Sequence, residues 1–252
     1  MNLVFASGYL FPQTLFGIHY FSGLEDRYKG QHRVSFPRVS PLATSAERAG
    51  ELAAGIQADI PQGDLHIIAH SMGGLDSRTL IGNNIGGLTG RIKSLTTLST
   101  PHKGSPVADF ILGPRPIGPP QDLYDKLRSI LERLNIKIGA LGDLTEGGAA
   151  QIPNVIVSHS QIRYRSYFGG GRSGLLPTSV ALKATHDLVK AAVPNQPNDG
   201  LVALESAKYG DFQQTFWSGD HADIVGHNLN DLIFGTRAFD HFPGYDKLIA
   251  QL

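Results

Sequence analysis

Short apolar runs alternate with amphipathic stretches along the first hundred residues. Four runs have the length and boundaries of strands, which are Leu3–Ala6, His32–Val39, Leu65–Ala69 and Ile92–Leu98. Pro37 would place the second of these at an edge or a bend. Between the runs, apolar residues repeat at helical spacing from Ser45, a good N-cap, to Ile56, and again over 75–81. This alternation predicts one α/β domain, with a mostly parallel central sheet and helices on both faces.

Residues 113–153 break this rhythm. A proline-rich stretch, 114–120, leads into an amphipathic segment at 122–134, and a glycine-rich run near 139–148 follows. The apolar face of the segment carries Leu123, Leu127, Ile130, Leu131 and Leu134. We interpret it as a helical lid inserted beyond the sheet, with a core-packing helix as the alternative. Later strands are expected at Val155–Val157, Arg163–Phe168, Leu201–Leu204 and Thr215–Trp217.

The composition of the chain excludes several functional classes. The 252 residues are 41% apolar, and 22 Lys and Arg balance 22 Asp and Glu, so no net charge attracts nucleic acid or an anionic membrane. The absence of cysteine excludes disulfides, thiolate metal sites and cysteine nucleophiles. The start of the chain has no basic region before its short apolar run, and no stretch has the ~20 apolar residues of a membrane span. We expect a soluble cytoplasmic protein, or one whose leader has been removed.

The segment Ala69-His70-Ser71-Met72-Gly73-Gly74 lies between a predicted strand and a predicted helix. This is the setting of a nucleophile elbow, a sharp turn that lifts a serine above the strand ends and requires small residues around it. The turn also leaves the backbone N–H of Met72 at a helix N-terminus, where developing negative charge is stabilised. We therefore predict Ser71 as a nucleophile; the alternative is an ordinary glycine-rich turn.

A serine nucleophile needs a base and a group that orients the base. His221 lies in a polar loop after a predicted strand, and Asp199 lies at a turn 22 residues earlier, in the order Ser, Asp, His. His227 is the rival base. The rival acids are Asp187, Asp211 and Asp220, and Asp199 could equally be only a turn residue, because Asn-Asp-Gly forms turns by itself.

Several segments, in the same order along the chain, resemble the true lipases of bacteria (lipase family I). Ser99–Phe110 is similar to the family's T-P-H-x-G-[ST]-x-x-A-D block, and weaker likenesses lie at 39–48 and 144–154. Asn198–Val202 resembles the block of the catalytic acid, and His221-Ala222-Asp223 the H-x-D block of the histidine. The resemblance implies an α/β-hydrolase fold, Asp199 and His221 as partners of Ser71, and the backbone N–H groups of Tyr9 and Met72 as the oxyanion hole.

The chain also departs from the family. Ser7-Gly8 stands where the family has His-Gly, which puts the internal bonding of the oxyanion loop in doubt. The family holds a structural calcium, and the resemblance gives Asp223 as one ligand, but Leu176 stands where a second carboxylate is wanted. Asp187 could substitute for it. We expect instead that Asp223 holds the His221 loop by hydrogen bonds. His102 is expected to structure the Thr100–Ser105 loop.

These observations together predict a serine carboxylic-ester hydrolase that needs no organic cofactor. The resemblance implies acylglycerols or other esters with apolar acyl chains as substrates, met at an oil–water interface if the lid opens there. Two alternatives stay open. One is an acyltransferase or polyester depolymerase that uses the same three residues, and the other is a non-catalytic binding protein on a hydrolase scaffold.

Overall fold

A six-stranded sheet forms the centre of the computed structural model, which describes residues 1–9, 14–15, 18–114, 121–133, 141–171, 178–214, 217–227 and 239–252. The strand order is β4-β1-β5-β6-β7-β8, and every neighbouring pair is parallel. In chain order the strands are β1 (Asn2–Ala6), β4 (Arg33–Ser35), β5 (Leu65–His70), β6 (Ile92–Leu98), β7 (Arg163–Tyr167) and β8 (Asp211–Phe212). A separate antiparallel pair is formed by β2 (Thr14–Leu15) and β3 (Ile18–His19). The prediction of a parallel sheet is confirmed.

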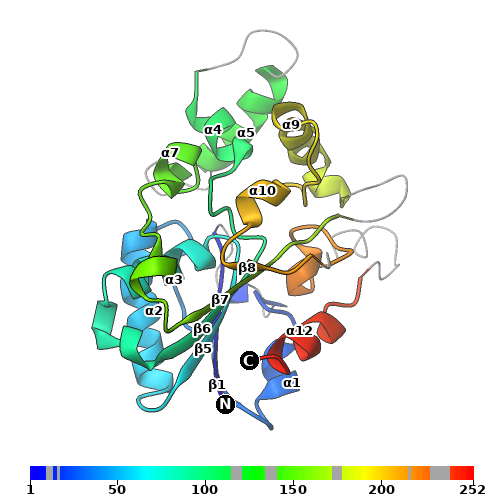
Figure 1. The fold of residues 1–252 in the computed structure, drawn as a ribbon. Helices are drawn as coiled ribbons and strands as arrows, with labels where there is room; N and C mark the ends of the chain where they lie inside the picture. Colours follow the sequence, from blue (N-terminus) through cyan, green and yellow to red (C-terminus); the bar gives the residue numbers. More distant parts are fainter. Residues whose placement is uncertain are drawn as a thin grey trace.

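Helices cover both faces of this sheet (Figure 1). One face carries α2 (Ser45–Asp59) and α3 (Gly73–Gly82), and the other carries α1 (Leu24–Tyr28) and α12 (Phe242–Ile249). The remaining helices are α4 (Pro106–Leu112), α5 (Gln121–Arg133), α7 (Glu146–Ala149), α8 (Val155–Ser158), α9 (Lys183–Ala192) and α10 (Leu204–Ala207). Short 3₁₀ turns lie at η1 (Ile85–Gly87), η2 (Thr89–Arg91), η3 (Val180–Leu182) and η4 (Asp223–Val225).

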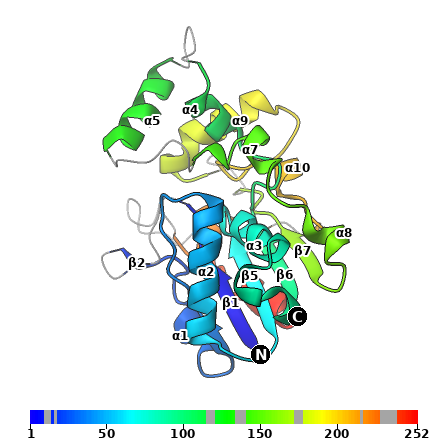
Figure 2. The same cartoon turned by 90° about the vertical axis from the view of Figure 1, so that its left-hand side faces the viewer.

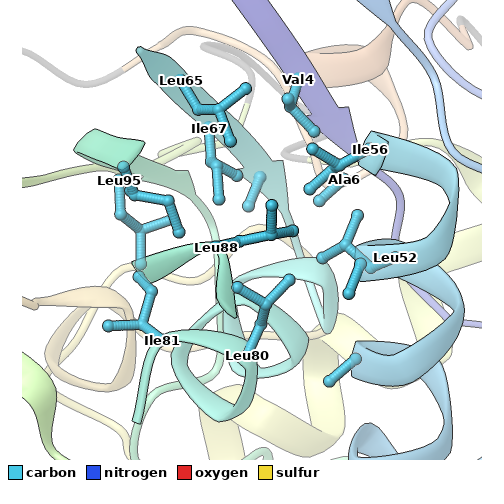
Figure 3. Close-up of a cluster of buried hydrophobic side chains, with 14 of the residues drawn as sticks. Val4, Ala6, Leu52, Ile56, Leu65, Ile67, Leu80, Ile81, Leu88 and Leu95 are labelled. Carbon is cyan, nitrogen blue, oxygen red and sulfur yellow. The ribbon is translucent and has the colours of Figure 1, made fainter. Parts of the chain in front are cut away.

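The alternation of side chains along the central strands supplies two apolar cores. Val4 and Ala6 of β1 pack with α2 and α3, while Leu3 and Phe5 pack on the opposite face with α1 and α12. Figure 3 shows the first core, in which side chains of three parallel strands meet those of two helices. Burying each such leucine or isoleucine contributes roughly 1.5–3 kcal/mol. Strands buried on both faces read as continuous apolar runs, which is why the sequence located them well.

A layer of helices lies beyond the carboxyl ends of the strands (Figures 1 and 2). It consists of α4, α5, α7 and α9, and we call α4, α5 and α9 the cap. The predicted amphipathic helix is present as α5, although Leu134 lies outside the described residues. Within the described parts of the chain, no helix is both long and apolar enough to span a membrane.

Several predicted boundaries are wrong. Val155–Val157 belongs to helix α8 and not to a strand, and Val157 is one of the most exposed apolar residues of the protein. Leu201–Leu204 is not a strand, because the carboxylate of Asp199 accepts the backbone N–H groups of Leu201 and Val202 and bends the chain. Of the last predicted strand, 215–216 lies outside the described residues, and Trp217 forms one parallel bridge with Gly169.

The start of α2 also differs from the prediction. Thr44, not Ser45, is the N-cap, and it forms a capping box with Glu47. The predicted second strand is shorter than expected, since only 33–35 pairs with β1, and it forms the edge of the sheet as Pro37 indicated.

Candidate active site

Ser71 lies in a strained turn between β5 and α3. Its φ of 54° is in the left-handed region, which a residue with a side chain adopts only when its surroundings enforce it. A Cβ on Gly73 would lie 2.7 Å from the carbonyl oxygen of Ser7, and one on Gly74 would lie 2.6 Å from Cγ2 of Thr100. The backbone N–H of Ser71 donates to the carbonyl of Leu98 on β6, at 3.0 Å. These close approaches are the physical reason for the small residues in the elbow.

The segment Ser7-Gly8-Tyr9 leaves β1 directly beside this turn, because β1 and β5 are neighbours in the sheet. A Cβ on Gly8 would lie 2.7 Å from Cβ of Ser71. Tyr9 and Met72 belong to one buried cluster. The two residues predicted to supply backbone N–H groups are therefore on either side of the serine.

Arg48 of α2 holds the Ser7–Tyr9 loop by hydrogen bonds to the backbone of the loop. Its side chain is fully buried, and Nη2 donates to the carbonyls of Ser7 and Gly8 at 2.7 and 3.0 Å. Nε donates to the carboxylate of Asp76 on α3 at 2.8 Å. Burial raises the pKa of Asp76 to about 6, and the charge of Arg48 opposes that rise. Since the loop is held through its carbonyls, the serine at position 7 does not disrupt it, and Ser7 Oγ has no hydrogen-bond partner among the described residues.

His221 and Asp199 form a buried pair. Nδ1 of His221 lies 2.8 Å from Oδ2 of Asp199, and the backbone N–H of His221 donates to the carbonyl of Asp199 at 2.9 Å. The other carboxylate oxygen accepts the N–H groups of Leu201 and Val202 at 3.0 and 2.8 Å. Asp199 is therefore both a turn former and the partner of an imidazole. The ring of His221 packs on that of His70, the residue before Ser71, with 4.5 Å between ring centroids.

The rival base and the rival acids are either bonded to other groups or exposed on the surface. Nε2 of His227 bonds the backbone carbonyl of Tyr20 at 2.8 Å. Asp187 is half exposed and pairs with Lys183 on the surface of α9, while Asp211 is exposed on the edge strand β8. Both carboxylate oxygens of the buried Asp220 accept backbone N–H groups, including that of Ser179 at 2.7 Å.

The two candidate calcium ligands, Asp223 and Asp187, have partners within the chain. Asp223 is fully buried, and its Oδ2 accepts the backbone N–H of Asp220 at 2.9 Å. Asp187 is engaged by Lys183, and Leu176 lies outside the described residues. In the part of the chain that the structure describes, no three histidine, aspartate, glutamate or cysteine side chains are grouped as metal ligands. The segment at Ser179 is instead tied to the His221 loop by the carboxylate of Asp220.

His102 has the structural position that was expected. Its Nε2 lies 3.0 Å from the hydroxyl of Thr97, its Nδ1 lies 3.2 Å from Nη1 of Arg78, and its ring stacks on Tyr209. Burial and the nearby charges of Arg78 and Lys103 lower the pKa of His102 well below its usual value, so the ring is neutral. It ties the loop after β6 to α3.

An apolar cluster joins the cap to the elbow. It contains Tyr9 and Met72 together with Val107 and Ile111 of α4 and Val189 of α9, and Leu127 of α5 packs against it. The sequence indicated only the contribution of α5. The contributions of α4 and α9 arise from packing between segments that are about eighty residues apart, which no local pattern reveals.

Comparison with known proteins finds similar lipases and esterases. No family model matches the chain. Triacylglycerol lipase 2 of Saccharomyces cerevisiae is 31% identical over 195 residues, which are 75% of this chain and 56% of the yeast protein. The chain thus spans little more than half the length of that relative.

Two solved structures resemble the whole chain. The mature form of a Bacillus licheniformis lipase has a TM-score of 0.65 and 20% identity, covering 93% of this chain and 90% of the other. A metagenomic carboxyl esterase has a TM-score of 0.71 and 18% identity, covering 99% and 74%. Together with the parallel sheet and the strained turn after β5, these likenesses show that the chain has the α/β-hydrolase fold.

Proposed function

We propose that this chain is a serine carboxylic-ester hydrolase with Ser71 as the nucleophile. The observation that carries the proposal is the buried Asp199–His221 pair, whose imidazole packs beside the strained turn that presents Ser71. The 31% identity to a triacylglycerol lipase supports the same reaction. A non-catalytic scaffold would have no need to keep a buried carboxylate, an imidazole and a strained serine together.

The reaction follows from these positions. His221 takes the proton of Ser71 as the hydroxyl attacks the ester carbonyl, and Asp199 orients the imidazole and stabilises its positive charge. The backbone N–H groups of Tyr9 and Met72 bind the oxyanion. His221 then protonates the departing alcohol. Water attacks the acyl-enzyme with His221 again as the base, the bond between the acyl group and Ser71 breaks to release the carboxylic acid, and His221 returns the proton to the Ser71 oxygen. Every proton passes through one imidazole, which Asp199 holds in a single orientation.

The substrate class is proposed from the cap. Its aliphatic side chains continue directly from Tyr9 and Met72, so an apolar acyl chain would meet apolar surface beyond the oxyanion hole. Acylglycerols and related esters with apolar acyl chains fit this surface, and the order of the sequence motifs favours the true lipases of bacteria. The same catalytic groups could pass the acyl chain to an alcohol or cleave a polyester, and the products distinguish these reactions.

We also propose that the hydrolase works without calcium. Asp220 and Asp223 bond backbone N–H groups, so the loop of His221 is held by the chain itself. A tightly bound metal would stabilise the native state by several kcal/mol, following RT ln(1 + [L]/Kd). Treatment with a chelator should therefore leave the melting temperature nearly unchanged. A large fall that calcium restores, and that is absent in Asp223→Ala, would contradict the proposal.

The direct test is covalent labelling. An organophosphonate ester should label the wild-type protein once, at Ser71, and Ser71→Ala should lose both labelling and ester hydrolysis while keeping its fold. The expected loss of turnover is on the order of 10⁴–10⁶. If Ser71→Ala retained a tenth of the wild-type activity, the assignment of the nucleophile would be wrong. Hydrolysis measured across esters of increasing acyl length, with and without an alcohol acceptor, would then define the substrate.

A further inference from the structure

Tyr20 links three separate parts of the candidate active site. It follows β3 and is 6% exposed. Its backbone carbonyl accepts a hydrogen bond from Nε2 of His227 at 2.8 Å, and the N–H of Ser22 donates to the carbonyl of Val225 at 2.9 Å. The segment at 20–22 is thus fixed to the loop that carries His221.

The hydroxyl of Tyr20 reaches the other two parts. Its oxygen lies 2.8 Å from Nδ1 of His70, the residue before Ser71. The same oxygen packs against Gly8, where an added Cβ would collide with it.

His70 in turn contacts His221. The two rings pack with 4.5 Å between their centroids. Complete burial lowers the pKa of His70 well below 6.5, and the charges that His221 and His227 can carry lower it further. A neutral His70 is the form that does not repel the imidazolium that His221 becomes during acyl transfer.

We propose that Tyr20 is a positioning residue of the hydrolase, and this inference rests on the proposed function. Its hydroxyl hydrogen-bonds His70 and packs against Gly8 in the loop of Tyr9, and His70 supports the ring of His221. The oxyanion donor and the general base are thereby kept at a fixed separation on the two sides of Ser71. A phenylalanine at this position would keep the packing and release both the loop and the imidazole.

The test compares Tyr20→Phe with Tyr28→Phe. Both tyrosines lie in the same buried cluster, and each hydroxyl has one side-chain partner; that of Tyr28 donates to Asp246 at 2.7 Å, away from the site. For a dissolved short-chain ester, Tyr20→Phe should lower kcat roughly tenfold or more with little change in KM, because small misplacements of reacting groups are costly. Tyr28→Phe should leave kcat unchanged. Melting temperatures should fall by similar amounts in both variants.

A second pair of variants tests the route through His70. In a His70→Phe background, Tyr20→Phe should lower kcat by a smaller factor than in the wild type, because the hydroxyl has already lost its imidazole partner. Equal effects in both backgrounds, or equal kcat in Tyr20→Phe and Tyr28→Phe, would overturn the inference. Failure of the proposed function has a different signature, since the wild type would then not be labelled by the phosphonate at Ser71.

Discussion

Two parts of the candidate site are stabilised by different kinds of interaction. We call the segments at 7–9, 70–74, 199–202 and 220–223 the floor, and the cap helices α4, α5 and α9 the roof. In the floor, buried polar groups each have specific partners: Arg48 of α2 donates to the 7–9 segment, and the carboxylates of Asp199 and Asp220 accept backbone N–H groups. In the roof, aliphatic side chains pack together, and the ion pair of Lys183 with Asp187 lies on its surface.

Because of this difference, the floor has a fixed geometry, whereas the helices of the roof can repack. Hydrogen bonds between buried groups are directional, and a buried group that loses its partner costs about 1–3 kcal/mol, so the floor has one arrangement. Apolar contacts are not directional, and amphipathic helices can repack with smaller losses. Under the proposed function, the chemistry would take place in the floor, and an apolar acyl chain would be accommodated by the roof. Changes in the floor should therefore affect turnover or folding, and changes in the roof should affect substrate preference.

The largest contrast is expected between two aspartates. Asp199→Asn should lower kcat by about 10⁴-fold, because an amide favours the wrong tautomer of the histidine it contacts. The matched change in the roof, Asp187→Asn, removes only an exposed pair and should leave kcat unchanged. Steady-state hydrolysis of a soluble ester measures both.

Combining Asp199→Asn with Ser71→Ala should add little, because the residues of a catalytic unit are strongly non-additive. Loss of turnover in Asp187→Asn with normal turnover in Asp199→Asn would reverse the assignment of the acid.

Arg48 should show the next largest effect, this time on stability. Arg48→Met leaves the buried carboxylate of Asp76 unpaired and frees the carbonyls of Ser7 and Gly8, and breaking such a pair costs about 3–5 kcal/mol. The control is Arg27→Met, which breaks a pair with Asp246 whose side chains are about 40% exposed and should cost about 0–1 kcal/mol. Urea denaturation compares them. Similar losses in the two variants would show that the burial of Arg48 contributes nothing special.

Low pH should destabilise the protein because two buried histidines, His70 and His102, are neutral in the native state. Burial lowers the pKa values of His70 and His102 well below their ordinary value of 6.5. In the unfolded chain these groups take up protons as the pH falls below 6.5, whereas in the native state they do not. Stability is therefore highest above that pH and declines below it, by about 1.4 kcal/mol per pH unit for each such group.

Denaturation midpoints at pH 7.5, 6.5 and 5.5 measure this decline. His102→Gln should reduce the slope, although it lowers stability at all three pH values. A stability that stays flat from pH 7.5 to pH 5.5 would contradict the neutral state of these rings.

The smallest effect is expected from the roof. Leu127→Gln adds a polar group to the face of α5 that packs toward the site, and Lys126→Gln places the same residue on the exposed face. If α5 is a lid, an oil–water interface favours its open form by covering the apolar face. Leu127→Gln should then flatten the rise of activity on a long-chain ester above its solubility limit, and Lys126→Gln should not.

Activity on a dissolved short-chain ester should change less than about twofold in both variants, because the helix is not part of the floor. If the melting temperature and both activities fell together in Leu127→Gln, α5 would be a fixed packing helix, as the alternative interpretation holds.

The contrast also explains what the sequence could predict. The strained turn at Ser71 and the pairing of Asp199 with His221 could be anticipated because each of these residues lies in a short motif. Tyr20 lies in no such motif, and the likeness at 39–48 gives Arg48 no role. Both residues act through distant partners such as His70 and Asp76, which lie 50 and 28 residues away in the chain. Val155–Val157 was assigned to a strand because three β-branched residues are too short a run to display helical spacing.

The floor contains segments from near both ends of the chain, and this affects how fast the site forms during folding. Tyr20 near the start bonds His227 near the end, beside a central sheet whose strands are all parallel. Parallel strands require long crossover connections, so contacts of this kind close long loops and form slowly. During refolding from denaturant, helical signal should return before ester hydrolysis does. Hydrolysis would thus report arrival at the complete topology, and a partly folded chain with a nearly native circular dichroism spectrum would be inactive.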